Sequence, residues 1–272
     1  MGERNEFRVP PVHRPGTDSG SDSVSDSVSD SVQFDAVTDL AGTMDAIRVF
    51  RAAWGEGDAQ DVDTYFAAAA HGSYLCVGRL ADRPVAAAFA FLSLDPVSGG
   101  LGLHSHMAAV LPEVSDRGIG RAIKLHQREW ALARGISAIT WTFDPLQRRN
   151  AWFNLVSLGA SVIGFRRNYY GSLDDDINGT DETDRFEVRW LLSDVGTDRT
   201  QRFLVDPLPH DQLVAVPADI GMLRRDDPAR AASEALRLRS QLVGLELGTH
   251  AIVGMSADCS YVLRERVVAP VP

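Results

Sequence analysis

Apolar residues follow two patterns along this chain, a helical spacing and compact runs. Near the start of the apolar part, five residues recur three or four positions apart, the spacing of one helix face: Leu40, Met44, Ile47, Phe50 and Trp54. This spacing predicts a helix that ends at Gly55 and Gly57, because glycine favours the backbone geometry that follows a helix. A second, short helix is expected over 62–70.

Compact apolar runs bounded by turn residues predict strands. The first three runs are 74–78 (YLCVG), 85–94 (VAAAFAFLSL) and 101–111 (LGLHSHMAAVL). A polar, glycine-bearing loop then leads into a helix expected over 121–134, which Gly135 ends. The next elements are a strand, a helix and two strands: 136–143, 150–158, 160–165 and 186–192. A βαβ unit inside this mixed order indicates an α/β or α+β sandwich.

The two ends of the chain differ in composition from its middle. Residues 1–33 contain three prolines and a Ser-Asp-Ser-Val repeat over 21–32. Such a segment buries too little apolar surface to offset its ordering entropy, so we expect a disordered tail. The main domain is expected over 34–194, and 195–272 is expected to be an extension or small lobe packed on it. The elements expected in the extension are a helix and two strands: about 227–245, 250–254 and 260–266.

Charge and cysteine content narrow the class of protein. The formal net charge is −10 and the pI is about 5.1. This argues against a nucleic-acid binder, which needs a basic patch to meet phosphates, and mildly favours a small or cationic substrate. Cys76 and Cys259 are expected to be reduced thiols. No apolar stretch approaches the roughly 18–20 residues of a membrane helix, and no signal peptide is evident, so a cytoplasmic protein with no membrane partner is expected.

The junction between the third strand and the following helix carries the chemistry. Gly118 and Gly120 open that helix. Free N–H groups at a helix N-terminus bind anions, and glycine lets a phosphate approach the main chain. Arg117 and Arg121 add positive charge beside it. The third glycine of a dinucleotide fingerprint and the Gly-Lys-Ser/Thr of a P-loop are both missing, so neither of these phosphate loops fits.

This stretch resembles the acyl-CoA motif of the GNAT N-acetyltransferase superfamily. In that motif a valine and a proline end a central strand, and Arg/Gln-x-x-Gly-x-Gly/Ala opens a helix. Six residues match it without a gap: Val110, Pro112, Gly118, Ile119, Gly120 and Ala122. Two residues depart from the motif. Ser115 stands where the family usually has Arg or Gln, and Asp116 stands where it often has Gly. The resemblance continues through 136–171 and is similar to a branch that includes acyltransferases thought to act on amino acids, some using succinyl-CoA.

The resemblance implies a fold and a co-substrate. The fold is a central mixed, mostly antiparallel, twisted sheet flanked by helices, with strands that splay at the cofactor site. The co-substrate is acetyl-CoA or another acyl-CoA, from which the acyl group passes directly to an attacking amine. The residues implied to bind it lie at the end of the third strand, in the glycine turn and at one asparagine: Ala108, Ala109, Val110, Ser115, Asp116, Arg117, Gly118, Ile119, Gly120, Arg121 and Asn150.

Several residues are candidates for the general base. His104 and His106 lie two apart on the third strand and so share a face, and an imidazole suits the deprotonation of an ammonium group near neutral pH. The alternative interpretation is that both are buried histidines whose hydrogen bonds are satisfied within the core. No metal site is expected, because no third ligand lies at a sensible spacing. Glu113 and Asp144, at strand ends, are alternative bases.

The general acid is expected to differ from the one common in the family. Many members carry a tyrosine where this chain has Leu155. Tyr169 and Tyr170 are possible replacements, because they follow a strand expected to end near the cleft, and rim or core aromatics are the alternative.

The resemblance therefore implies an N-acyltransferase that acetylates or succinylates the amine of a small molecule such as an amino acid. A homodimer is considered, with no nucleic-acid partner. One alternative is a degenerate fold that binds CoA without turnover, which Ser115 and Leu155 favour. The other alternative is a protein N-acetyltransferase.

Overall fold

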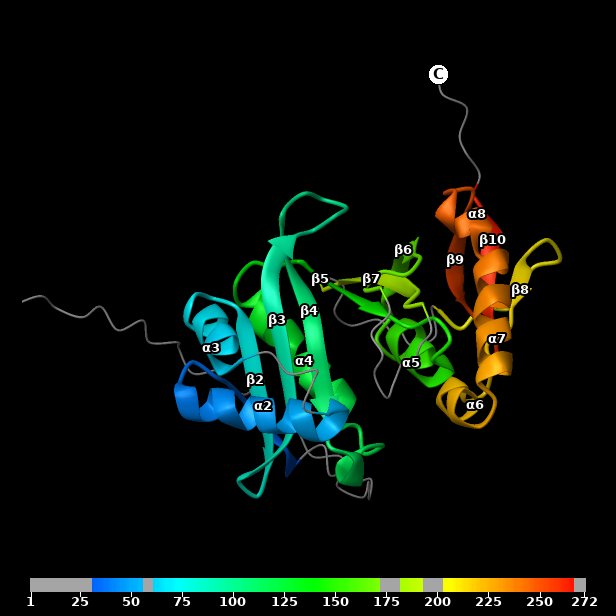
Figure 1. Ribbon diagram of the computed structural model, residues 1–272. Helices are drawn as coiled ribbons and strands as arrows, with labels where there is room; N and C mark the ends of the chain where they lie inside the picture. Colours follow the sequence, from blue (N-terminus) through cyan, green and yellow to red (C-terminus); the bar gives the residue numbers. More distant parts are fainter. Residues whose placement is uncertain (1–30, 56–60, 172–181, 193–202, 267–272) are drawn as a thin grey trace, which may run out of the picture.

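The computed structural model describes residues 31–55, 61–171, 182–192 and 203–266, so most of the expected tail lies outside the described residues. A seven-stranded sheet, in the order β1-β2-β3-β4-β5-β7-β6, forms the centre (Figure 1). Its strands are β1 (Gln33–Ala36), β2 (Tyr74–Leu80), β3 (Arg83–Leu94), β4 (Leu101–Val110), β5 (Ala138–Phe143), β6 (Ser161–Arg166) and β7 (Arg185–Leu191). Five of the six neighbouring pairs are antiparallel, and β4–β5 is parallel. The prediction of a mixed, mostly antiparallel sheet is confirmed.

Helices cover both faces of this sheet (Figure 1). On one face lie α2 (Leu40–Trp54) and α3 (Val62–Ala70), and Tyr65 of α3 meets Phe89 of β3 edge to face, with 4.9 Å between ring centroids. On the other face lies α4 (Ile119–Leu132), whose Trp130 packs against Tyr74 of β2. Because both faces are covered, β2 and β3 are buried on both sides, which explains why they read as continuous apolar runs rather than as alternating ones.

Two helices near the glycine turn differ in detail from prediction. The helix α4 begins at Ile119, two residues early, because Gly118 adopts a left-handed conformation (φ 79°) as its N-cap. The helix expected over 150–158 is α5 (Arg148–Trp152), which continues as a π-helical turn over Phe153–Ser157. In that turn the N–H of Leu158 donates to the carbonyl of Phe153. Such π turns are rare and often occur at functional sites.

The strand β1 was not predicted, since its residues were assigned to the tail or to the start of the domain. It pairs with the edge of β2, with Phe34 opposite Gly78. A Cβ atom at Gly78 would lie 2.6 Å from the Phe34 ring, so the glycine provides the space that the ring fills. A four-residue strand with no alternating burial leaves no periodic signal, which explains why the sequence did not reveal it.

Residues 203–266 form a second, three-stranded sheet in the order β8-β10-β9. The elements of this lobe are β8 (Gln212–Val214), α6 (Ile220–Asp226), α7 (Pro228–Gln241), α8 (Val243–Glu246), β9 (His250–Met255) and β10 (Tyr261–Glu265). The single helix expected over 227–245 is therefore two helices. The elements β8 and α6 were missed because they are too short to show a period.

Residues just after β5 and at the start of β7 hold this lobe. The Tyr261 hydroxyl donates to the carbonyl of Pro145 at 2.7 Å, and the Tyr261 ring packs edge-on against Phe186. Arg224 donates to the largely buried Asp144 at 3.0 Å. Asp144, considered above as a base, is thus occupied by an ion pair that joins the lobe to the main sheet.

A buried ion pair lies at the end of the sheet where β4 begins. Asp95, just after β3, accepts hydrogen bonds from Nε and an Nη of Arg189 on β7, both at 2.7 Å. The Asp95 side chain is fully buried and that of Arg189 is 16% exposed. These hydrogen bonds hold the pKa of Asp95 well below its usual range. The pair joins the β3–β4 hairpin to β7 across the end of β5.

We expect Asp95→Asn to lower the free energy of unfolding by roughly 3 kcal/mol at pH 7, because it leaves Arg189 buried without a counter-charge. A carboxyl whose folded pKa is depressed contributes stability above its unfolded pKa, about 3.9, and loses it as the pH falls further. The difference between variant and wild type is therefore expected to shrink at pH 3. Urea unfolding at both pH values measures it, and equal stability at pH 7 would contradict the assignment.

Candidate functional site

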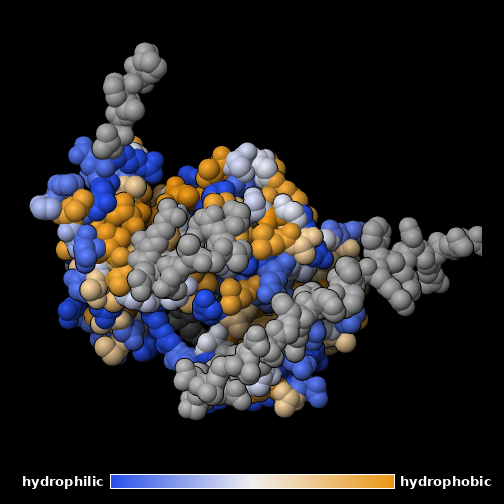
Figure 2. All heavy atoms as spheres, turned by 180° about the vertical axis from the view of Figure 1, so that it is seen from behind, coloured by the Kyte–Doolittle hydropathy of each residue, from blue (hydrophilic) through white to orange (hydrophobic). Residues whose placement is uncertain are grey.

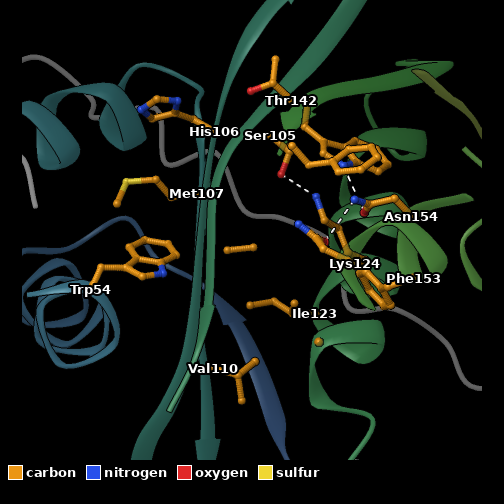
Figure 3. A pocket seen from close by; sticks show the side chains of 15 residues that line it. Trp54, Ser105, His106, Met107, Val110, Ile123, Lys124, Thr142, Phe153 and Asn154 are labelled. Carbon is orange, nitrogen blue, oxygen red and sulfur yellow. Dashed lines mark hydrogen bonds between the residues drawn. The ribbon is translucent and has the colours of Figure 1, made fainter. Parts of the chain in front are cut away.

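The strands β4 and β5 separate soon after they meet. They pair at Leu103–Ile139 and His104–Thr140 and diverge beyond these two pairs. A cavity of about 240 Å³, the wedge cavity, opens between them (Figure 3). It is lined by Trp54, Ser105, His106, Met107, Ala108, Val110, Gly120, Ile123, Lys124, Trp141, Thr142, Phe143, Asn150, Phe153 and Asn154. The splayed strands implied by the resemblance are therefore present.

A second cavity, the turn cavity, lies at the N-terminus of α4. It is lined by Val110, Ser115, Asp116, Gly118, Ile119, Gly120, Arg121, Gln147, Arg149, Asn150, Phe153 and Ser157. Val110, Gly120, Asn150 and Phe153 line both cavities, so the two adjoin, and together they are called the groove. Seen from behind the view of Figure 1, the molecule is hollowed near its centre (Figure 2).

The glycine turn presents backbone donors to the turn cavity. The N–H groups of Ile119 and Gly120 precede the first backbone hydrogen bond of α4, which the N–H of Arg121 donates to the carbonyl of Gly118. Within the described residues these two donors have no backbone partner, and such donors attract an anion together with the helix dipole. A Cβ atom built on Gly120 meets no atom within 4 Å, so this position faces open space in the groove.

Most residues predicted to bind the cofactor line this groove. Eight line the turn cavity: Val110, Ser115, Asp116, Gly118, Ile119, Gly120, Arg121 and Asn150. Ala108 lines the wedge cavity, whereas Ala109 is buried and Arg117 lines neither cavity.

Two side-chain contacts at the turn cavity were not predicted. Asp116 forms an ion pair with Arg149, so the negative charge that departs from the family motif is met by a cation of α5. A chain of hydrogen bonds orients Asn150, because Trp141 Nε1 donates to Asn154 Oδ1 at 3.2 Å and Asn154 Nδ2 donates to Asn150 Oδ1 at 3.1 Å. The amide of Asn150 is thereby fixed where the two cavities join.

A β-bulge interrupts β4 next to the wedge cavity. Ser105 pairs with Ala90 and Met107 with Phe89, which leaves His106 as the extra residue of β4. His106 and Met107 consequently both lie on the α2–α3 side of β4, whereas Lys124 lies on the other side (Figure 3). Bulges of this kind re-aim side chains and recur beside active sites.

The two histidines of β4 occupy different positions. Both rings pack against Phe91, so they share a face. His106 lines the wedge cavity, and desolvation lowers its pKa from 6.5. His104 lies outside the cavity lining and contacts Thr140 Oγ1 at 3.1 Å, and burial lowers its pKa to about 4. Both imidazoles are therefore neutral at neutral pH, and only His106 reaches the cavity.

The other acid and base candidates lie farther away. Glu113 is exposed and ion-paired with Arg83, and it lines neither cavity. The Tyr170 hydroxyl lies 3.2 Å from Oγ1 of Thr142, a wall residue of the wedge cavity. Tyr169 packs edge-on against Tyr170 and is partly exposed. Tyr170 is thus one hydrogen bond from the wedge cavity.

Lys124 is a site residue that sequence reasoning missed. It lies on α4, is 7% exposed and lines the wedge cavity. Its ammonium group donates to Ser105 Oγ at 2.7 Å and lies 4.3 Å from the centroid of the Trp141 ring. The sequence did contain a feature that singles out this residue, because Lys124 is the single lysine in a chain with 27 lysine and arginine residues.

No protein-family model and no curated protein sequence matches this chain. Among solved structures, the ribosomal-protein-S18-alanine N-acetyltransferase from Escherichia coli is similar at 17% identity and a TM-score of 0.49, over 61% of this chain and 97% of that one. Arabidopsis thaliana Naa50, in complex with a bisubstrate analogue, is similar at 19% identity and a TM-score of 0.47, over 58% and 97%.

A GNAT family acetyltransferase from Elizabethkingia anophelis with acetyl-CoA bound is similar at 13% identity and a TM-score of 0.47, over 60% of this chain and 99% of that one. At such identities, any inference of function must rest on the site residues of this chain.

In the described part of the chain, no helix is long and apolar enough to cross a membrane.

Proposed function

We propose that this protein is an acyl-CoA-dependent N-acyltransferase that acylates the amine of a small molecule such as an amino acid. One observation carries the proposal, namely the groove of two adjoining cavities, one at the glycine turn at the start of α4 and one in the gap between β4 and β5. A long ligand with an anionic end and a reactive opposite end matches the chemistry along this groove.

The residues of the groove fit the parts of acyl-CoA. The N–H groups of Ile119 and Gly120 and the side chain of Arg121 would hold the diphosphate, where Gly120 leaves room for it. The oriented amide of Asn150 and the backbone of Ala108 to Val110 would hold the pantetheine arm. When bound, acyl-CoA supplies an activated carbonyl that a neutral amine can attack.

The residues of the wedge cavity suggest how protons move. His106 is neutral at pH 7 and is proposed to accept a proton from the attacking amine on the α2–α3 side of β4. Trp54 and Met107 would wall the acceptor on that side. Tyr170 is proposed as the general acid and to act through Thr142, because their hydroxyl groups lie 3.2 Å apart.

A second candidate function is CoA binding without turnover. Leu155, at the position where many family members carry a catalytic tyrosine, is 1% exposed and offers no polar group to the groove. Turnover of an amine would exclude this reading, whereas thioester binding without any turnover would favour it.

Titration calorimetry of the protein with acetyl-CoA, succinyl-CoA and free CoA tests the cofactor site. We expect micromolar binding, as for a groove that contacts both the diphosphate and the pantetheine arm. The thioester that binds best then directs a screen of amino acids and other amines. Failure of every CoA species to bind would rule out the acyltransferase.

A further inference from the structure

The closed end of the wedge cavity holds a buried ammonium group. Ser105 and Trp141 follow directly after the last paired residues of β4 and β5, and Lys124 lies between them. Besides Ser105, Lys124 donates to Gln127 Oε1 at 3.3 Å. Both hydrogen-bond partners are neutral. No aspartate or glutamate is among the described residues that line this cavity.

This cluster is short of hydrogen-bond acceptors. An ammonium group has three N–H donors, and two of them are accounted for by Ser105 and Gln127. The Gln127 amide nitrogen is buried and has no hydrogen-bond partner among the described residues. A buried donor without an acceptor is costly, and Lys124 lines the wedge cavity, so its third N–H is suited to a ligand that brings acceptor oxygens and a negative charge.

The choice of lysine is itself informative. Of the 27 lysine and arginine residues, all but Lys124 are arginines, and an arginine remains charged in all surroundings. An arginine buried here without a counter-charge would carry the full cost of desolvation. Lysine avoids this cost by losing its proton, and burial lowers the pKa of Lys124 to about 7. The ammonium form then returns when an anion enters the cavity.

We propose that Lys124 binds a carboxylate at the far end of the transferred acyl group, so that the acyl donor is a dicarboxylic acyl thioester such as succinyl-CoA. This inference rests on the proposed function, because it places the thioester in the wedge cavity. Lys124 is then the residue that selects the acyl group, and the glycine turn at the other end of the groove holds the diphosphate common to all CoA species.

Calorimetry of thioesters in the absence of any acceptor tests the proposal. We expect wild-type protein to bind succinyl-CoA at least about tenfold more tightly than acetyl-CoA, the effect of one charge-assisted hydrogen bond. Lys124→Met keeps the length of the side chain and removes its charge, so it is expected to bind both thioesters equally. Thermal melting checks that Lys124→Met is folded. Lys124→Gln, which also removes the charge but keeps a polar group, is expected to lose the preference too and replaces Lys124→Met if that variant does not fold.

Arg121→Met provides the matched control, since it removes a positive charge at the opposite end of the groove. It is expected to weaken the binding of succinyl-CoA and of acetyl-CoA by the same factor and to leave the preference for succinyl-CoA unchanged. A preference that Lys124→Met does not change would overturn the inference while the proposed function survives. Failure of wild type to bind any CoA species would defeat both. An effect of Lys124→Met confined to the KM of a carboxylate-bearing acceptor would also overturn it.

Proton uptake gives an independent readout. At pH 8 the histidines of β4, His104 and His106, and His126 on α4 are neutral, because burial lowers their pKa values below 6.5. Lys124 is mostly neutral there too, and a carboxylate beside it raises its pKa. Binding of succinyl-CoA should therefore take up nearly one proton, measured from binding enthalpies in buffers of different ionisation enthalpy. Equal uptake with acetyl-CoA, or none with either thioester, would overturn the inference.

Discussion

Gly120→Trp is expected to abolish binding of acetyl-CoA, succinyl-CoA and free CoA. Gly120 lines both cavities, and a Cβ atom built on it enters open space, so an indole at this position would fill the passage between them. It would also block access to the N–H groups of Ile119 and Gly120. We expect affinity to fall by more than about 100-fold, because the diphosphate loses several charge-assisted hydrogen bonds together. Titration calorimetry measures the loss.

Gly120→Ala is the control for this variant. Gly120 is the second residue of α4 and does not have a positive φ, so alanine fits the backbone and is expected to raise the melting temperature slightly. Its methyl group should change CoA affinity only a few-fold. Retained CoA binding by a folded Gly120→Trp protein would mean that the ligand does not pass the glycine turn, and the proposed cofactor site would be wrong.

Local sequence patterns were sufficient for the glycine turn. Gly118 must adopt a left-handed conformation where β4 leads into α4, and glycine is the residue that does so without strain. Gly120 must lack a side chain where the groove passes. Both requirements act over a few neighbouring residues, so they leave a readable motif in the sequence.

Features that depend on contacts across the sheet left no such motif. The bulge at His106 is defined by the register of β4 against β3, and alternation along β4 alone does not reveal it. The acceptor-poor surroundings of Lys124 arise because α4, β4 and β5 meet there. Gln127 lies three positions from Lys124, which is helix spacing, but Ser105 lies 19 positions away on another element. What the sequence did offer was the unusual count of one lysine.

If the proposed function holds, His106→Asn is expected to lower kcat by about 100-fold or more with any amine that the protein is found to acylate, while thioester affinity stays unchanged. The imidazole of His106 lies in the wedge cavity on the α2–α3 side, and a positioned general base contributes this much to a rate. Asparagine keeps a polar group of similar size and removes the basic nitrogen. Steady-state kinetics with saturating thioester measures the effect.

His104→Asn is the matched control, two residues away on the same face of β4. Its imidazole contacts Thr140 and does not line the cavity, so a smaller loss of kcat is expected. The wild-type pH profile adds a second check. Because desolvation lowers the pKa of His106 from 6.5, kcat/KM should rise with pH below that value and level off above it. A larger loss in His104→Asn, or an unchanged acid limb in His106→Asn, would assign the base to another residue.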